Sequence, residues 1–231
     1  QAHIVYFSRV AHHHSGSTMS LPAAPSVLLQ AGFIGLSVVM AAFLAWFTQR
    51  RALAAAWLVL TGALSLSGVF ESFTPPLLPL LLFPALFAVT TLAWRSSWHQ
   101  HSLRLLVGFQ AFRIVVELLI HRAVTEGVAP PQFTWTGLNW DVASGVLALL
   151  LLPFADRLPR YALHLFNAIG WGLLLNVMVV AVLSMPTPLQ QLHPDNIWIG
   201  FFPFTWLPLI LVVAAWTGHV VLLKKLVATS A

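Results

Sequence analysis

Seven long apolar stretches constrain this chain more than any other feature of its sequence. They cover residues 26–47, 52–70, 75–94, 103–121, 138–152, 161–184 and 197–223. Most are close to the ~20 residues that an α-helix needs in order to cross ~30 Å of hydrocarbon. Membrane β-strands would instead alternate in polarity over about ten residues. The sequence therefore predicts an all-α fold, a polytopic transmembrane bundle of seven helices.

The composition also indicates a membrane protein. Of the 231 residues, 59% are hydrophobic and 7% are charged, whereas a soluble domain carries roughly 25% charged residues. The lipid bilayer is therefore the expected partner, and nothing in the pattern predicts nucleic-acid binding or a particular oligomeric state. Because the chain has no cysteine, disulfides and thiolate chemistry are excluded.

The positions of the charged residues predict the orientation in the membrane. Eight cations fall at those ends of the apolar stretches that would share one side: Arg50, Arg51, Arg95, Arg104, Arg157, Arg160, Lys224 and Lys225. Asp156 lies among them, and the other acidic residues fall in the opposite half or its loops: Glu71, Glu117, Glu126, Asp141 and Asp195. Because loops rich in Lys and Arg stay in the cytoplasm, we expect an external N-terminus and a cytoplasmic C-terminus.

The first eighteen residues differ from the rest of the chain. Three consecutive histidines are followed by a short polar segment that ends at Met19, which resembles a purification tag joined to a native start. We therefore interpret residues 1–18 as tag and linker. Residues 19–231 contain no dividing linker and are predicted to form a single seven-helix domain.

Small residues and prolines predict where helices meet and bend. Gly62, Ser65 and Gly68 lie three residues apart and form an edge that lets a neighbouring helix approach closely. Pro203 and Pro208 fall within the last apolar stretch, where proline frees backbone carbonyls and bends a helix. We expect close packing at the first feature and a kink at the second.

A polar stripe within stretch 103–121 is the best clue to function. Its members recur at intervals of three, four and four, and so share one face of a helix: Gln110, Arg113, Glu117 and His121. An ionisable group in the hydrocarbon region costs ~2.5–3.5 kcal/mol on insertion scales. These side chains should therefore face the interior of the bundle or a hydrated cavity.

Further polar residues fall at a similar depth in neighbouring helices. The expected ligand-binding residues are Glu71, Arg113, Glu117, His121, Asp141 and Asn176, with Trp206 between the prolines at 203 and 208 near the floor of the cavity. In this hypothesis the pocket opens outward and binds a small polar or anionic molecule, for sensing or transport. Arg113 contacts the anionic group, Glu117 and Asp141 orient Arg113 or accept hydrogen bonds, and His121 guards the mouth.

Three alternatives remain open. The first is a structural or assembly subunit in which Arg113 and Glu117 form a closed ion pair, while His121 and Asp141 are interfacial. The second is an intramembrane hydrolase that holds zinc with Glu117, His121 and Asp141, although Arg113 one turn below would repel the cation. The third is haem between two histidines of matching depth, His164 and His219. No cofactor is predicted in the favoured reading.

Resemblance to known families is limited. Seven helices with an external N-terminus resemble rhodopsins and other seven-helix receptors in topology alone. No lysine precedes Lys224 in the last stretch, so the retinal Schiff base of rhodopsins cannot form there. No helical stretch contains a His-x-x-x-His pair, which argues against the progestin-receptor-like and ceramidase-like zinc hydrolases.

A more specific resemblance rests on several short segments. They are Phe112 with Arg113, Glu117 with Leu118, His121 with Arg122, residues 133–141, residues 186–188 and residues 202–208. Together these segments look like a set of uncharacterised bacterial integral membrane proteins, over the predicted fourth to seventh helices. The resemblance implies a bacterial inner-membrane location and brings no activity with it.

Overall fold

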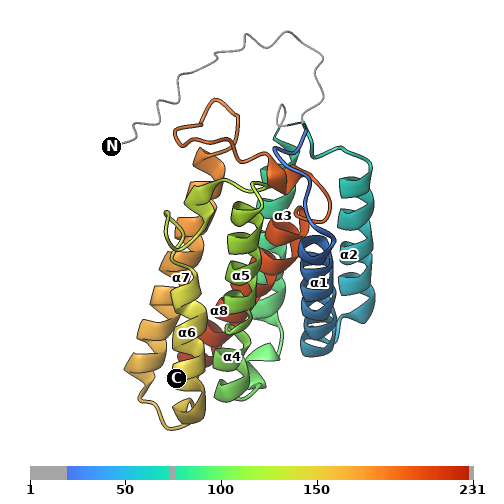
Figure 1. The fold of residues 1–231 in the computed structure, drawn as a ribbon. Helices are drawn as coiled ribbons and strands as arrows, with labels where there is room; N and C mark the ends of the chain where they lie inside the picture. The colour runs from blue at the N-terminus through green and yellow to red at the C-terminus, as the bar shows by residue number, and fades with distance from the viewer. Residues whose placement is uncertain (1–19, 73–75, 229–231) are drawn as a thin grey trace, which may run out of the picture.

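The computed structural model describes residues 20–72 and 76–228. Its helices are α1 (Val27–Thr48), α2 (Arg51–Leu66), α3 (Leu77–Arg95), α4 (Leu103–Phe109), α5 (Phe112–Thr125), α6 (Val142–Leu151), α7 (Arg160–Leu183) and α8 (Val213–Ala228). Short helical turns are η1 (Trp98–Gln100), η2 (Pro131–Phe133), η3 (Leu152–Phe154), η4 (Trp198–Gly200) and the π-helical η5 (Leu207–Val212). All regular structure in these residues is helical, which confirms the all-α prediction there (Figure 1). The interpretation of residues 1–18 as a tag lies outside the described residues.

Four helices are long and apolar enough to cross a membrane. They are α1, α3, α7 and the continuous helix Leu207–Ala228, which joins η5 to α8. The apolar helices α2 and Val142–Phe154 are shorter. The chain therefore has the fold of a helical membrane protein, whereas seven complete spans stay a prediction.

The fourth predicted helix is divided into α4 and α5. At the junction, the backbone N–H of Arg113 bonds to the carbonyl of Gln110 at 3.2 Å, three residues back instead of four. Gly145 of α6 lies against this turn, since a Cβ on Gly145 would come within 3.0 Å of the Ile114 backbone nitrogen. The turn with three-residue hydrogen bonding therefore lies where Gly145 of α6 approaches the backbone of α5. Arg113, Glu117 and His121 remain together on α5.

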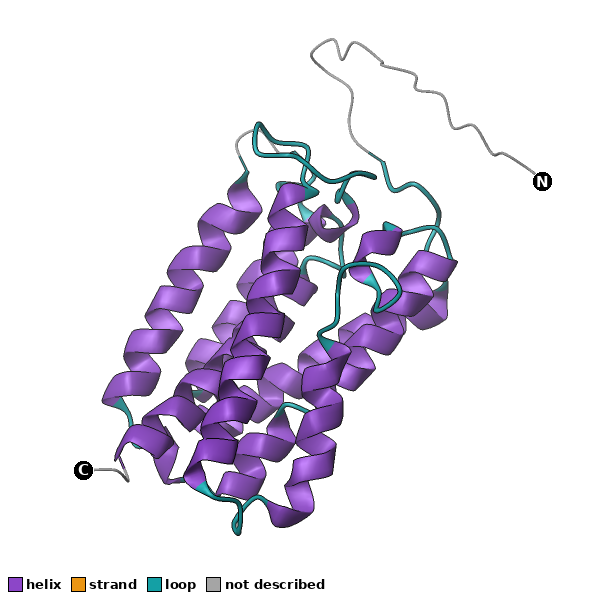
Figure 2. Ribbon diagram, turned by 90° about the vertical axis from the view of Figure 1, so that its left-hand side faces the viewer, coloured by secondary structure: helices purple, strands orange, loops and turns teal. Residues whose placement is uncertain are grey.

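The helix Leu207–Ala228 occupies the centre of the bundle. In an apolar stretch of 18 residues in this helix, 78% is buried inside the protein. The corresponding share is 22 to 28% in α1, α3 and α7. Apolar side chains on the surrounding helices therefore face outward, where lipid would cover them. Both α3 and α7 pack against this central helix but scarcely against each other. Figure 2 shows α3 at the left edge, below the short grey segment, standing apart from α7 in front.

Gly62 and Ser65 of the predicted small-residue edge pack against the segment that leads into the central helix, as expected, whereas Gly68 lies in the turn after α2, with a φ of 75°. Trp206 lies on Gly62, where a Cβ would come within 3.0 Å of its ring. The Trp206 indole donates to Thr61 Oγ1 at 3.1 Å, and the Ser65 and Thr205 hydroxyls are 2.8 Å apart. Packing rather than ligand binding explains this edge.

Side-chain hydrogen bonds join the start of α1 to the end of α5. Ser26, the N-cap of α1, donates its hydroxyl and its backbone N–H to the Glu126 carboxylate at 2.7 and 2.8 Å. Arg122 donates to the same carboxylate at 2.5 Å. The hydroxyl bond, then the backbone bond, lowers the pKa of Glu126 from its ordinary 4.5 to about 2, with a smaller contribution from Arg122.

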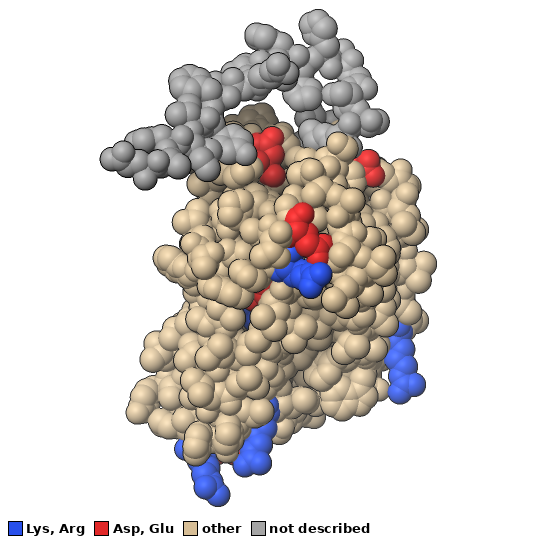
Figure 3. All heavy atoms as spheres, viewed as in Figure 1, with Lys and Arg blue, Asp and Glu red and all other residues tan. Residues whose placement is uncertain are grey.

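Basic residues gather at the opposite end of the molecule. The α1–α2 connection, the ends of α3 and α8, the start of α4 and the α6–α7 connection all lie toward the lower end in Figure 1. These segments and the helix residues next to them carry the eight cations named above. On the face shown in Figure 3, acidic side chains lie in the upper half and most basic ones lie at the lower end. The predicted asymmetry of charge is therefore present in the fold.

Candidate intramembrane binding site

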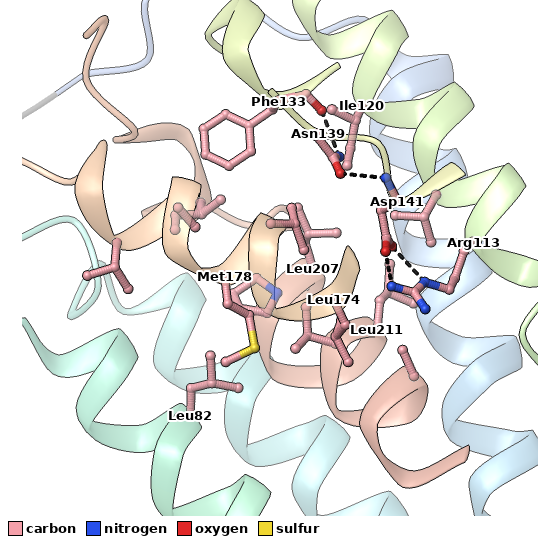
Figure 4. A pocket seen from close by; sticks show the side chains of 18 of the residues that line it. Leu82, Arg113, Ile120, Phe133, Asn139, Asp141, Leu174, Met178, Leu207 and Leu211 are labelled. Carbon is pink, nitrogen blue, oxygen red and sulfur yellow. Dashed lines mark hydrogen bonds and ion pairs between the residues drawn. The ribbon is translucent and has the colours of Figure 1, made fainter. Parts of the chain in front are cut away.

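A cavity of about 70 Å³ lies among α3, α5, α7 and the central helix. Most of its lining is apolar and includes Leu82, Leu174, Met178, Leu207 and Leu211 (Figure 4). The polar lining residues are Arg113 and Glu117 of α5, and Asn139 and Asp141 of the segment that leads into α6. The cavity thus has one polar wall and several apolar ones.

Arg113 pairs with Asp141, not with Glu117. Its Nε donates to one Asp141 oxygen at 2.6 Å, and Nη2 donates to the other oxygen. The arginine is 2% exposed and the aspartate side chain 13% exposed. This bidentate geometry fixes the guanidinium more firmly than a single contact would. The closed Arg113–Glu117 pair, expected from their spacing, is therefore replaced by a pair between two helices.

The other side of the guanidinium is bonded deeper in the protein. Nη1 of Arg113 lies 3.0 Å from His219 Nε2 and donates to the Gly170 carbonyl at 3.4 Å. Because Arg113 donates, His219 Nε2 accepts, and its Nδ1 then donates to Asn167 Oδ1 at 2.8 Å. A side chain on Gly170 would overlap the His219 ring, so the glycine allows α7 and the central helix to meet here.

Glu117 has a different environment from Asp141. It is 1% exposed, and its Oε2 accepts a hydrogen bond of 2.8 Å from Asn139. The Trp135 backbone also interacts with this carboxyl group, but Oε1 itself has no hydrogen-bond partner within the described residues. A buried carboxyl oxygen without a donor is costly. Glu117 is therefore the incompletely bonded polar group of the cavity wall.

Asn139 holds the polar wall in shape. Its amide donates to Glu117 and to the Phe133 carbonyl at 2.9 Å, and its Oδ1 accepts from the backbone N–H of Asp141 at 3.0 Å. These bonds fix the segment 133–141 above the cavity (Figure 4). Asn139 is 1% exposed, and no spacing on the polar stripe pointed to it.

The structure brings three of the expected site residues together and places the other four elsewhere. Arg113, Glu117 and Asp141 line the cavity. His121 instead stacks on Trp135, with ring centres 4.5 Å apart, and Asn176 donates to the Leu138 carbonyl at 2.7 Å.

Glu71 and Trp206 are also absent from the cavity lining. Glu71 lies beyond the end of α2, beside Gly68. The Trp206 indole points toward α2, because its N–H bonds to Thr61 there. The next residue, Leu207, lines the cavity in place of the tryptophan.

The donor sets for zinc and haem are not assembled in the described part of the chain. No three His, Cys, Asp or Glu side chains lie close enough there to hold a metal ion. Asp141 is paired with Arg113, and His121 is stacked on Trp135. Both ring nitrogens of His219 are hydrogen bonded, while His164 is exposed.

The described residues thus form a helical bundle with four helices long and apolar enough to cross a membrane, and a buried ion pair borders a cavity among its helices. The chain belongs to the family described as a domain of unknown function, DUF8737, whose model matches residues 73–227. All cavity-lining residues fall within this range, whereas α1 and α2 precede it. No curated protein and no solved structure matches the chain.

Proposed function

We propose that this is a multi-pass protein of the bacterial inner membrane that binds a small molecule in the cavity among α3, α5, α7 and the central helix. One observation carries the proposal: Arg113, Glu117 and Asp141 line a cavity whose other walls are apolar. Pockets with apolar walls and a few polar groups are typical ligand sites. Stability alone is a poor reason for a buried ion pair, because desolvation can exceed the Coulombic gain.

The proposed orientation has the N-terminus outside and the C-terminus in the cytoplasm. It is supported by the eight cations at the lower end of the bundle and by the positive-inside rule. Seven crossings follow if α4 and α5 together make one, and α2 and Val142–Phe154 make one each. The bacterial location follows from the resemblance to bacterial membrane proteins.

We propose binding, as in a sensor, rather than transport. Below Arg113, toward the basic end, the polar side chains are tightly packed: Gln110 and His219 are 0% exposed and Asn167 is 3% exposed. Transport would require these groups to separate and open a path. Nothing in the packing around them favours such an opening.

A structural or assembly subunit is the second candidate. It is favoured by the bonding of Arg113, which already uses its Nε, Nη1 and Nη2 groups within the protein. The hydrolase alternative has no comparable support, because its three ligands do not meet.

The test is to identify what co-purifies with the protein by mass spectrometry, in three forms. Met178 lines the cavity, and Met178→Trp would fill it. Val179, the next residue on α7, is 54% exposed, so Val179→Trp is a matched control that faces lipid. We expect a compound that is present in the wild type and in Val179→Trp but lost from Met178→Trp. The same compounds in all three forms would contradict ligand binding and favour the assembly subunit.

A further inference from the structure

We infer that the ligand is a single-chain amphiphile with a protonated amine headgroup, bound at Glu117, whose apolar chain leaves the cavity between α3 and α7. This inference rests on the proposed binding function and names its ligand class. It differs from the small polar or anionic molecule expected from the sequence. The charge of the wall, the bonding of Arg113 and the shape of the cavity carry it.

The charge of the polar wall favours a cation. Arg113 and Asp141 neutralise each other through their bidentate contact. His219 accepts a hydrogen bond from Arg113 and is therefore the neutral tautomer. Ionised Glu117 would leave the cluster with one net negative charge. A bound monocation restores neutrality, whereas a bound anion would double the imbalance in a low-dielectric region.

The hydrogen bonds of Arg113 and Glu117 also favour a cationic ligand. The guanidinium has five N–H groups, and four are used: Nε and Nη2 on Asp141, and Nη1 on Gly170 and His219. Arg113 is thus nearly saturated and poorly placed to receive an anion. In ionised Glu117, Oε1 is an acceptor, and it is the cavity-lining side-chain atom that lacks a partner among the described residues. A hydrogen-bond donor, such as an ammonium group, would satisfy this oxygen.

The size of the cavity limits what it can enclose. Its volume of about 70 Å³ is far below the ~300–1,000 Å³ of pockets that bury drug-sized ligands. A headgroup and the start of a chain fit within it. The remainder of a larger molecule would have to lie outside.

We place the exit of the chain between α3 and α7. Both helices line the cavity, with Leu82 and Phe83 on one side and Met178 and Val182 on the other. These two helices scarcely pack on each other, and Phe83 is 52% exposed. Since the surfaces of both helices are apolar, an opening between them would face the lipid. A chain that extends through it would continue among the lipid tails.

Three probes of equal chain length test the inference: octylamine, octanol and octanoate. At neutral pH they are a cation, a neutral molecule and an anion. Wild-type protein, Glu117→Gln and Met178→Trp are placed in phosphatidylcholine nanodiscs. Thermal unfolding midpoints are measured against probe concentration, after correction for partitioning into protein-free nanodiscs. Val179→Trp serves as the control for added bulk.

We expect octylamine to stabilise the wild type at concentrations about tenfold lower than octanoate. Glu117→Gln should abolish this preference, and Met178→Trp should remove all three effects. A preference for octanoate, or a preference for octylamine that survives in Glu117→Gln, would overturn the inference while leaving cavity binding intact. Equal effects in the wild type and in Met178→Trp would overturn both. If Glu117→Gln fails to fold, the inference is tested on the wild type alone, by comparing the concentrations at which the three probes stabilise it.

Discussion

Arg113 is the residue on which the buried polar cluster depends. It joins α5 to Asp141 at the start of α6, to Gly170 on α7 and to His219 on the central helix. Four segments distant in the chain therefore meet at one guanidinium. A cluster of this kind couples the helices, because the loss of one partner leaves the others incompletely bonded.

The pairing of Arg113 with Asp141 predicts strongly non-additive mutations. Arg113→Met should destabilise the protein by ~3–5 kcal/mol, because it leaves the buried Asp141 carboxylate without its cation. Asp141→Asn should also destabilise the protein, because Arg113 then loses its bidentate partner. The double variant should lose less than the sum. Thermal unfolding in detergent measures all three. Arg104 and Asp156, a pair whose side chains are 56% and 46% exposed, form the control cycle, with an expected coupling of ~0.2–1 kcal/mol. Additive losses at Arg113 and Asp141 would show that they are not partners.

Glu126 predicts a dependence of stability on acid pH. Because its pKa is lowered from 4.5 to about 2, its contribution to stability is present above pH 4.5 and is lost as the pH falls toward 2. The difference in unfolding midpoint between the wild type and Glu126→Gln should therefore shrink over this window. Ser26→Ala should reduce the difference at neutral pH, since the hydroxyl bond is the largest cause of the shift. A difference that stays constant from neutral pH to pH 3 would refute the assignment.

At the scale of elements, the junction between α2 and the central helix is held by side-chain hydrogen bonds. The π-helical turn η5 alters the regular backbone bonding at the start of this helix. The Trp57 indole of α2 donates to the Leu209 carbonyl in this turn at 2.8 Å. α2 thus satisfies a carbonyl in the irregular turn.

Replacement of this donor should be costly. Trp57→Phe keeps the aromatic bulk but leaves the buried Leu209 carbonyl without the indole, so we expect a loss of ~1–3 kcal/mol. Trp46→Phe on α1 is the control, because Trp46 is 50% exposed and a surface change costs within about 0.5 kcal/mol. Chemical unfolding in mixed micelles compares the two. Equal losses would mean that the indole bond contributes nothing specific.

The elements also show what the sequence could predict. Hydropathy located the helices because each must be apolar over the width of a membrane, and helical spacing placed Arg113 and Glu117 on one face. Asp141 was expected near Arg113 from its depth in the neighbouring helix. Spacing could not give the contact of Arg113 with His219, because His219 lies 106 residues away and tertiary packing decides which side chain lies there. Trp206 was misplaced for a related reason. The expected kink at Pro203 is wrong, because the helix begins at Leu207 and Trp206 is its N-cap. The direction of the Trp206 side chain depends on the neighbour, here Gly62 of α2.

For the whole molecule, the orientation can be tested by cysteine labelling, since the chain has no native cysteine. Leu189→Cys, at a position that is 63% exposed in the connection after α7, should react with an impermeant maleimide added to intact cells. Arg157→Cys, in the connection before α7, should react only after the membrane is permeabilised. The reverse pattern would place the basic end outside and refute the proposed orientation.

The place of the central helix in the chain bears on how the protein is made. The surrounding helices leave the ribosome before residues 207–228 do, since domains and helices emerge from the N-terminus onward. Until that segment is inserted, α3 and α7 lack the helix against which both pack most extensively, and Arg113 has no His219 to bond. The nascent protein would then expose intramembrane polar groups of the kind that membrane chaperones and quality-control proteases can recognise. Synthesis of residues 207–228 is therefore the step that ends this exposure, and the cavity completes its walls only then.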